Sequence, residues 1–331
     1  MIIDPPESMR ESILDIFRQY ARPLGAKESL VPSTECRLTP VRAVLTDIYG
    51  TVVCSGVGDI SLSEETDSDG HFFDALKEGY ENWEWWIQKA RATHFSPSQV
   101  FRELILDEHR RSRVEGEPYP EVNILQVWHD LLTRWNGEAS GFVSEPLSLA
   151  RIATAYECLS NPVWPYEGVF DALAEFRDQG IPVGIVSNSQ FYTPLMIEYF
   201  GGKSLCELGI DESLCVWSYR EGRGKPSSEL FHSAADRLEK FYGIKASEAV
   251  FIGNDMLKDM VASHRAGFQT ALFAGDARSL RLRQDDRDCC DFSPGWVFRN
   301  WREFMEQLPV ESDPASRLET QHPPESGPES L

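Results

Sequence analysis

The sequence lacks long hydrophobic runs. None of its apolar stretches reaches the roughly 18 residues that a membrane-spanning helix needs. Residues 1–17 also lack the basic start, apolar centre and small-residue cleavage site of a signal peptide. We therefore expect a soluble protein without a membrane partner.

Positively charged residues are scarce. Lysine and arginine number 32 against 53 aspartates and glutamates, which gives a formal net charge of -21. Because nucleic acids are bound by clustered Lys and Arg, this balance argues against a nucleic-acid partner. An acidic protein can still bind a small anion when its site supplies a cation and a few focused donors. The charge therefore favours a metal-assisted site over an open basic groove.

The cysteines and histidines are not spaced as in metal-binding motifs. The seven cysteines are dispersed without CxxC spacing, and Cys289 and Cys290 are adjacent. This is not the pattern of a disulfide framework or a zinc site. The seven histidines include no His-Glu-x-x-His, which argues against a zinc hydrolase. The cytoplasm is the expected compartment.

What is present is an alternation of strands and helices. Short apolar runs bounded by turn residues fit buried parallel strands, and alternation with helices implies βαβ crossovers. The sequence therefore predicts an α/β protein with a Rossmann-like, three-layer parallel-sheet core. The predicted strands are Val41–Thr46, Ile181–Val186, Ser213–Ser218, Ala249–Ile252 and Thr270–Phe273, and the predicted helices are Ser8–Tyr20, Val169–Gln179, Thr193–Phe200, Ser228–Tyr242 and Met256–Ala266.

One segment differs from the rest in its amino-acid composition and periodicity. Residues 56–165 are rich in tryptophan, show helical periodicity around Val100–Arg110 and Ile124–Trp135, and contain few β-branched runs. We predict a smaller helical domain inserted into the core. The predicted domains are an N-terminal extension over 1–40, a core formed by 41–55 and 166–309, the helical insertion over 56–165, and a disordered tail over 310–331, which is biased to Pro, Glu and Ser.

Polar residues follow three of the predicted strands. Asp47, Ser187 and Asp255 each stand at or just after a strand end, and Lys225 lies between the second and third. In open parallel sheets, ligands bind outside the carboxyl ends of the strands. These side chains are therefore expected to converge on one crevice.

The order of these motifs resembles the haloacid dehalogenase superfamily of hydrolases. The family's four motifs are an Asp-x-Asp-Gly-Thr after a strand, a strand ending in Ser or Thr, a Lys that commonly precedes Pro, and paired acids. All four appear here in the family's order, and many members carry a helical cap between the first two. The matching residues are Asp47-Ile48-Tyr49-Gly50-Thr51, Ser187-Asn188, Lys225-Pro226, and Gly253-Asn254-Asp255 with Asp259.

The resemblance implies a catalytic role for several residues. Asp47 is the expected nucleophile, since a carboxylate attacks an anionic substrate well when positive neighbours neutralise it. Lys225 is expected to stabilise both Asp47 and the substrate. The hydroxyls of Thr51 and Ser187, with backbone N–H groups near Ser187, are expected to bind phosphate-like oxygens. Asn188 and Tyr49 are expected to bind the substrate.

A magnesium ion is the expected cofactor. Mg²⁺ takes oxygen ligands and usually one or two carboxylates from the protein. The predicted ligands are Asp47, the backbone carbonyl of Tyr49, and Asp255, with Asp259 supporting through water or by orienting Lys225. The register allows Asn254 to replace Asp255 as the ligand.

Tyr49 departs from the family's phosphatase pattern. It replaces the second Asp, which serves as general acid and base, and an ordinary tyrosine pKa near 10 makes it a poor substitute at neutral pH. The leading hypothesis is a Mg²⁺-dependent phosphatase of a small phosphorylated metabolite. The substrate then has a good leaving group, or the cap supplies the acid.

Two alternatives stay open. Asp-x-Tyr-Gly-Thr resembles the family's 2-haloacid dehalogenases, whose halide leaving group needs no proton; Arg91 and Arg102 are candidate carboxylate ligands for that reaction. The other alternative is a non-catalytic binding protein. Trp83–Trp86 are interpreted either as a lid or as packing within the insertion, and a homodimer is one option for assembly.

Overall fold

A computed structural model describes residues 6–57, 69–137 and 145–310 of the chain. Its centre is a six-stranded sheet in the order β5-β4-β1-β6-β7-β8, and each neighbouring pair is parallel. The strands are β1 (Ala43–Thr46), β4 (Val183–Ser187), β5 (Val216–Trp217), β6 (Ala249–Gly253), β7 (Gln269–Phe273) and β8 (Trp296–Phe298). The predicted α/β class and parallel sheet are confirmed.

Alternate residues of the central strand point to opposite helical layers, as the two-residue period of a strand requires. Val44 packs into one hydrophobic core, whereas Ala43 and Leu45 pack into the second. The first core includes Phe176 of α7, and the second includes Phe231 of α10. The sheet is therefore the middle of three layers, as predicted.

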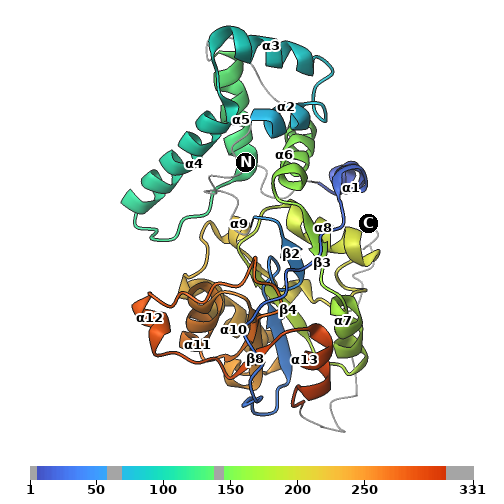
Figure 1. Cartoon of the computed structure of the whole chain (residues 1–331), viewed down its shortest axis with the longest axis vertical. Coiled ribbons are helices and arrows are strands. Elements are labelled where there is room, and N and C mark those ends of the chain that lie inside the picture. Colours follow the sequence, from blue (N-terminus) through green and yellow to red (C-terminus); the bar gives the residue numbers. More distant parts are fainter. Residues whose placement is uncertain (1–5, 58–68, 138–144, 311–331) are drawn as a thin grey trace, which may run out of the picture.

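The helices cover both faces of the sheet and form a second mass beside it (Figure 1). Helix α1, expected from the sequence, packs against α6 and α8. The helices are α1 (Glu7–Tyr20), α2 (Asp69–Leu76), α3 (Trp83–Thr93), α4 (Pro97–Val114), α5 (Ile124–Asn136), α6 (Pro146–Ser160), α7 (Val169–Asp178), α8 (Tyr192–Gly201), α9 (Ser218–Glu221), α10 (Ser228–Tyr242), α11 (Ala262–Arg265), α12 (Arg287–Cys290) and α13 (Trp301–Gln307), with 3-10 helices η4 (Glu212–Leu214) and η5 (Ala246–Glu248) and a π-helix η6 (Met256–Val261).

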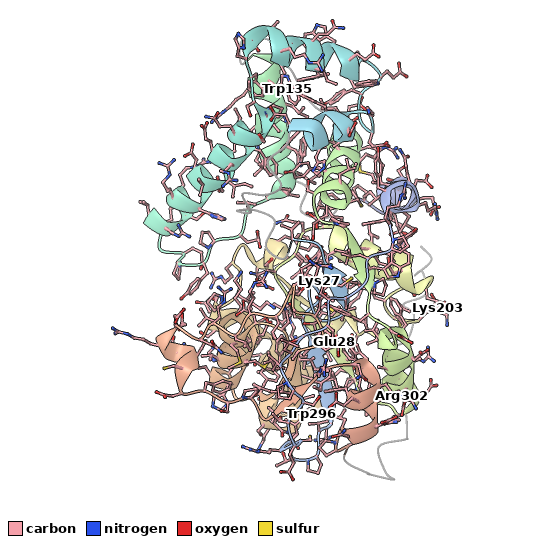
Figure 2. All side chains as sticks on the ribbon, in the orientation of Figure 1. Lys27, Glu28, Trp135, Lys203, Trp296 and Arg302 are labelled. Carbon is pink, nitrogen blue, oxygen red and sulfur yellow. The ribbon has the colours of Figure 1, made fainter. Side chains whose placement is uncertain are left out.

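The segment predicted to be helical contains α2 to α6 in its described part, and its aromatic residues form its packing. Trp128 is fully buried, and Trp86 and Trp135 pack edge-to-face with ring centroids 5.6 Å apart. Figure 2 shows Trp135 among these upper helices and Trp296 at the opposite end of the molecule. Its action as a separate cap domain stays a prediction.

Several elements differ from the predicted ones. A two-stranded antiparallel sheet, β2 (Val53–Ser55) with β3 (Val163–Pro165), stands where the chain leaves and re-enters the core. The strand β8 follows Thr270–Phe273, which was expected to be the last. The helix expected over Met256–Ala266 begins as a π-helix. Such short or distorted elements are set by tertiary packing, which periodicity does not report.

Some predictions fall on residues outside the described part of the chain. These are the tail over 311–331 and the stretches 58–68 and 138–144 of the insertion.

All seven cysteines are free thiols. Among the described residues, no helix has both the length and the apolar character needed to cross a bilayer.

Candidate active site

A cavity of about 410 Å³ lies between the carboxyl ends of the central strands and the helices α4 and α6. The core contributes many of the polar and charged residues of its wall, and the two helices contribute both apolar and ionisable ones. The core residues include Asp47, Tyr49, Asn188, Lys225, Asn254, Asp255, Lys258 and Asp259; from the helices come Phe101, Ile105, His109, Arg113, Ala153, Tyr156 and Glu157. Of the four side chains predicted to converge on one crevice, Asp47, Lys225 and Asp255 line this cavity, and Ser187 lies behind it, bonded to Asp47.

Asp47 follows β1 directly. Its backbone N–H donates to the carbonyl of Ile252 on the neighbouring strand, which fixes the position of the residue. The hydroxyl of Ser187 donates to Oδ1 at 2.8 Å, and Nζ of Lys225 lies 2.8 Å from the same oxygen. Within the described residues, Ser187 and Lys225 thus both bind the same oxygen of the carboxylate, Oδ1.

Lys225 is held between two carboxylates. Its ammonium lies 2.5 Å from Oδ1 of Asp259 and 2.8 Å from Oδ1 of Asp47. Burial by itself would lower the pKa of Lys225, but Asp259 and Asp47 outweigh it and raise the pKa above the ordinary value. Lys225 is thus a permanent positive charge beside the Asp47 carboxylate.

Asn188 positions this lysine. Its side-chain carbonyl accepts from the backbone N–H of Lys225 at 2.6 Å, and its amide nitrogen donates to the Lys225 carbonyl at 3.4 Å. The sequence assigned Asn188 to substrate binding. It does line the cavity, but both groups of its amide engage the Lys225 backbone.

Ser187 and Thr51 are fully buried and do not line the cavity. Ser187 donates to Asp47, and the Thr51 hydroxyl donates to Oδ1 of Asn254 at 3.2 Å. The sequence assigned both hydroxyls to phosphate-like oxygens. In the structure they support the residues that face the cavity instead.

Gly50 lets the loop after β1 approach the loop after β6. Its φ is +85°, and a Cβ at this position would lie 2.4 Å from Nδ2 of Asn254. Asn254 therefore packs directly against the turn that follows Asp47.

The four predicted metal ligands do not come together as a cluster. Asp255 accepts from the backbone N–H groups of Leu257 and Lys258, and its carboxylate pairs with Arg283 at 2.6 Å. Asp259 accepts from the backbone N–H groups of Asn254 and Asp255 and pairs with Lys225.

Within residues 6–57, 69–137 and 145–310, no group of three or more His, Cys, Asp or Glu could hold a metal ion. A smaller set of oxygen donors lines the cavity. Asp47, Tyr49 and Asn254 all belong to its wall. One carboxylate, one amide oxygen and one carbonyl, completed by water and a substrate phosphate, suit this ion.

Tyr49 lines the cavity, but its hydroxyl is engaged with the hydroxyl of Thr193 on α8 at 2.9 Å. Burial raises the pKa of Tyr49 well above its ordinary value, and Glu157 adds to the shift. Tyr49 therefore keeps its proton at neutral pH and does not act as a base there.

Several cavity residues were not identified from the sequence, among them Glu157, Lys258, Arg281 and Arg283. The two arginines belong to a stretch, 278–283, that contains three arginines in an otherwise acidic chain. That local concentration is a signal that could have found them. Glu157 lies within a helix whose orientation a single sequence does not reveal.

The residues of the insertion that the sequence suggested for the site do not line the cavity. Trp86 is buried against Trp135, Trp85 is 43% exposed, and neither lines the cavity. The interpretation of Trp83–Trp86 as internal packing is therefore closer to the structure than a lid. Arg91 and Arg102 also do not line the cavity.

The chain is similar in sequence to two phosphatases. Glyceraldehyde 3-phosphate phosphatase of Methanopyrus kandleri is 29% identical over 212 residues, which cover 62% of this chain and 79% of that protein. Ribulose-1,5-bisphosphate 5-phosphatase of Halopiger xanaduensis is 29% identical over 119 residues, covering 35% of this chain and 45% of that protein.

A solved structure shares the fold. The 2-haloacid dehalogenase of Pseudomonas syringae pv. Tomato DC3000 has a TM-score of 0.50 and 18% identity, covering 81% of this chain and 98% of its own. The family model described as haloacid dehalogenase-like hydrolase matches residues 41–267, more than half of the chain. The chain belongs to the haloacid dehalogenase-like hydrolases.

Proposed function

We propose that this protein is a phosphatase of a small phosphorylated metabolite and that it forms a covalent aspartyl intermediate at Asp47. One observation carries the proposal. Asp47 is held through Oδ1 by Ser187 and Lys225 at the floor of a cavity, which leaves Oδ2 as the attacking atom. A carboxylate in this setting is a competent nucleophile toward phosphorus.

The charges around the cavity suit a phosphoryl group. Five basic residues and five acids line it, although the chain as a whole is strongly acidic: Arg113, Lys225, Lys258, Arg281 and Arg283 against Asp47, Glu121, Glu157, Asp255 and Asp259. The basic side chains attract an anionic substrate and stabilise charge that develops as phosphorus is transferred. The two curated relatives are both named as phosphatases, which supports the same reaction class.

The reaction divides into two displacements. Oδ2 of Asp47 attacks phosphorus while the bond from phosphorus to the leaving oxygen breaks. Lys225 compensates the negative charge that accumulates between Asp47 and the phosphoryl group. Water then displaces the Asp47 carboxylate from phosphorus, so that inorganic phosphate is released and Asp47 is regenerated.

Magnesium is proposed as the cofactor, with a ligand set different from the one the sequence suggested. Asp47, the Tyr49 carbonyl and Asn254 would hold the ion. Asp255 is paired with the cation Arg283 and Asp259 with Lys225, whereas the side-chain oxygen of Asn254 accepts from the neutral hydroxyl of Thr51. When bound, Mg²⁺ would neutralise phosphoryl charge and help to orient the substrate.

The test is phosphate release from a panel of small phosphate esters and from 4-nitrophenyl phosphate, with and without Mg²⁺. Mg²⁺-dependent release supports the proposal. No release, together with Mg²⁺-independent halide release from 2-haloacids, would reject it.

A 2-haloacid dehalogenase is the second candidate, and one observation favours it. Tyr49 keeps its proton and is bound to Thr193, so the usual general acid is missing, and a halide leaving group would need none. The halide assay on 2-haloacids decides between the two reactions.

A non-catalytic binding protein is separated from both by Asp47→Asn. A loss of turnover in a variant with an unchanged Tm identifies an enzyme that uses Asp47.

A further inference from the structure

The phosphatase reaction needs a proton donor for the leaving alcohol, and Tyr49 does not supply it. A different carboxyl group lines the same cavity. Glu157 lies on α6, is 4% exposed, and shares the cavity wall with Asp47 and Tyr49. Two hydrogen bonds hold it, because Tyr192 donates to Oε2 at 2.9 Å and Asn161 donates to Oε1 at 3.1 Å.

We propose that Glu157 is the general acid and base of the reaction, supplied from the insertion to replace the group that Tyr49 lacks. This inference rests on the proposed phosphatase function. Three elements define the position, since α6 carries Glu157, α8 carries Tyr192, and the turn after β1 carries Tyr49.

Glu157 gives up one proton in the first displacement and regains one in the second. In the first, the Asp47–phosphorus bond forms, the bond to the leaving oxygen breaks, and the carboxylic acid of Glu157 gives its proton to that oxygen. In the second, the Glu157 carboxylate takes a proton from the attacking water, and phosphate leaves Asp47. Glu157 ends protonated and Asp47 ends ionised, as both began.

A purely structural carboxylate fits this position poorly. Buried acids are normally paired with a cation. Within the described residues, Glu157 has no ion pair, and its hydrogen-bond partners are an amide and a phenol. A glutamine would make similar contacts without a charge. The carboxyl group is therefore the feature that needs an explanation.

The titration of Glu157 is consistent with the role. Burial raises its pKa to about 7, against opposing hydrogen bonds from Asn161 and Tyr192. Its charge raises the pKa of Tyr49, Tyr192 and Cys158, and the titratable or charged side chains of His109, Arg113 and Glu121 line the same cavity. At neutral pH both protonation states are populated, as an acid that later acts as a base requires.

Leaving-group dependence provides the test. Benzyl phosphate releases a basic alkoxide that must be protonated, whereas 4-nitrophenyl phosphate releases a stable phenolate that needs no proton. In single-turnover experiments with Mg²⁺, Glu157→Gln should slow cleavage of benzyl phosphate by about 100-fold or more. The burst of 4-nitrophenolate should change by less than about 3-fold, because that step needs no acid.

Glu198→Gln is the matched control. Glu198 is a largely buried acid on α8 that pairs with Arg10 at 2.5 Å, away from the cavity, so its loss should leave the ratio of the two rates unchanged. Equal loss on both substrates, or loss on neither, in the Glu157 variant would overturn the proposal. Failure of the wild type to release 4-nitrophenolate would instead overturn the phosphatase function.

A second measurement needs no variant. In the wild-type protein, the ratio of the single-turnover rate on benzyl phosphate to that on 4-nitrophenyl phosphate should fall as pH rises through about 7. A ratio that stays constant between pH 5.5 and 8.5, on the order of three pH units, would contradict a titrating acid at Glu157.

Discussion

Two guanidinium nitrogens of Arg283 donate to the carboxylate of Asp255, and one of them lies 2.6 Å from Oδ2. The main chain keeps the two residues side by side, because Arg281 exchanges backbone hydrogen bonds with Asn254 and Met256. Arg283 also has a φ of +50°, which is uncommon for a non-glycine residue. Asp255 is therefore a helix cap and an ion-pair partner, and Asn254 packs against the turn after Asp47, which is why we propose Asn254 as the metal ligand in its place.

Magnesium titration should therefore distinguish these neighbours. Asn254→Ala removes a proposed ligand and should raise the Mg²⁺ concentration needed for half-maximal activity by about 10-fold or more. Asp255→Asn keeps a capping side chain and should leave that concentration within about 2-fold of wild type. The measurement is phosphate release against Mg²⁺ after treatment with EDTA. The reverse order of the two variants would restore Asp255 as the ligand.

Replacement of the nucleophile should abolish turnover without unfolding the protein. Asp47→Asn keeps the shape of the side chain but removes the attacking carboxylate, so turnover should fall by at least about 1000-fold. Lys225 retains Asp259 as its partner, and Tm should stay close to that of the wild type. Activity assays and thermal melts of both proteins check this, and a variant that turns over at the wild-type rate would exclude Asp47 as nucleophile.

Lys225→Met should destabilise the fold as well as stop catalysis. It leaves the buried carboxylates of Asp47 and Asp259 without their shared cation, a loss that costs about 3–5 kcal/mol in buried ion pairs. Denaturant unfolding measures the effect.

Adding Asp259→Asn to this variant removes one of the two stranded charges and should recover part of the lost stability. Full additivity of the two changes would argue against the ion pair as the cause.

Gly50→Ala should lower both stability and activity. The added methyl group would meet Asn254 at 2.4 Å and must adopt a φ of +85°, so the change should cost about 1–3 kcal/mol. Gly243→Ala is the control, because Gly243 also has a positive φ, +62°, but no atom lies within 4 Å of its Cβ position. A similar loss of activity in both variants would show that contact with Asn254 is unimportant.

Stability should depend on pH through Glu157. Its folded pKa of about 7 lies above the ordinary value of 4.5, so its contribution is fully present below pH 4.5 and is lost as pH rises through 7. Relative to Glu157→Gln, the wild type should lose up to about 3 kcal/mol of unfolding free energy between pH 4.5 and 8.

Burial also raises the pKa of Asp259, which gives a pH dependence of the same sign. Both proteins carry Asp259, so the difference between them isolates Glu157. Parallel stability curves for the two proteins would contradict a raised pKa at Glu157.

The sequence alone determined the fold class of this protein and the edge of the sheet at which its polar residues meet. Apolar runs of strand length that alternate with helical periodicity predict a parallel sheet, and polar residues at the ends of successive strands must meet at one edge. Asp47, Lys225 and Asp259 were found this way, because their positions follow from local patterns repeated in a fixed order. The replacement of the family's second Asp by Tyr49 was also visible in the sequence, since recognising it requires only the identity of one residue.

Tertiary structure decided which side chains face the cavity and what each of them contacts. Asn254 and Asp255 are neighbours in sequence, and only the packing of Gly50 and the position of Arg283 separate their roles. Glu157 was not found, because the direction in which α6 presents its residues depends on packing against α1, α2 and α5. Strand ends are set by local sequence, whereas contacts between segments far apart in the chain are set by the energy of the whole fold.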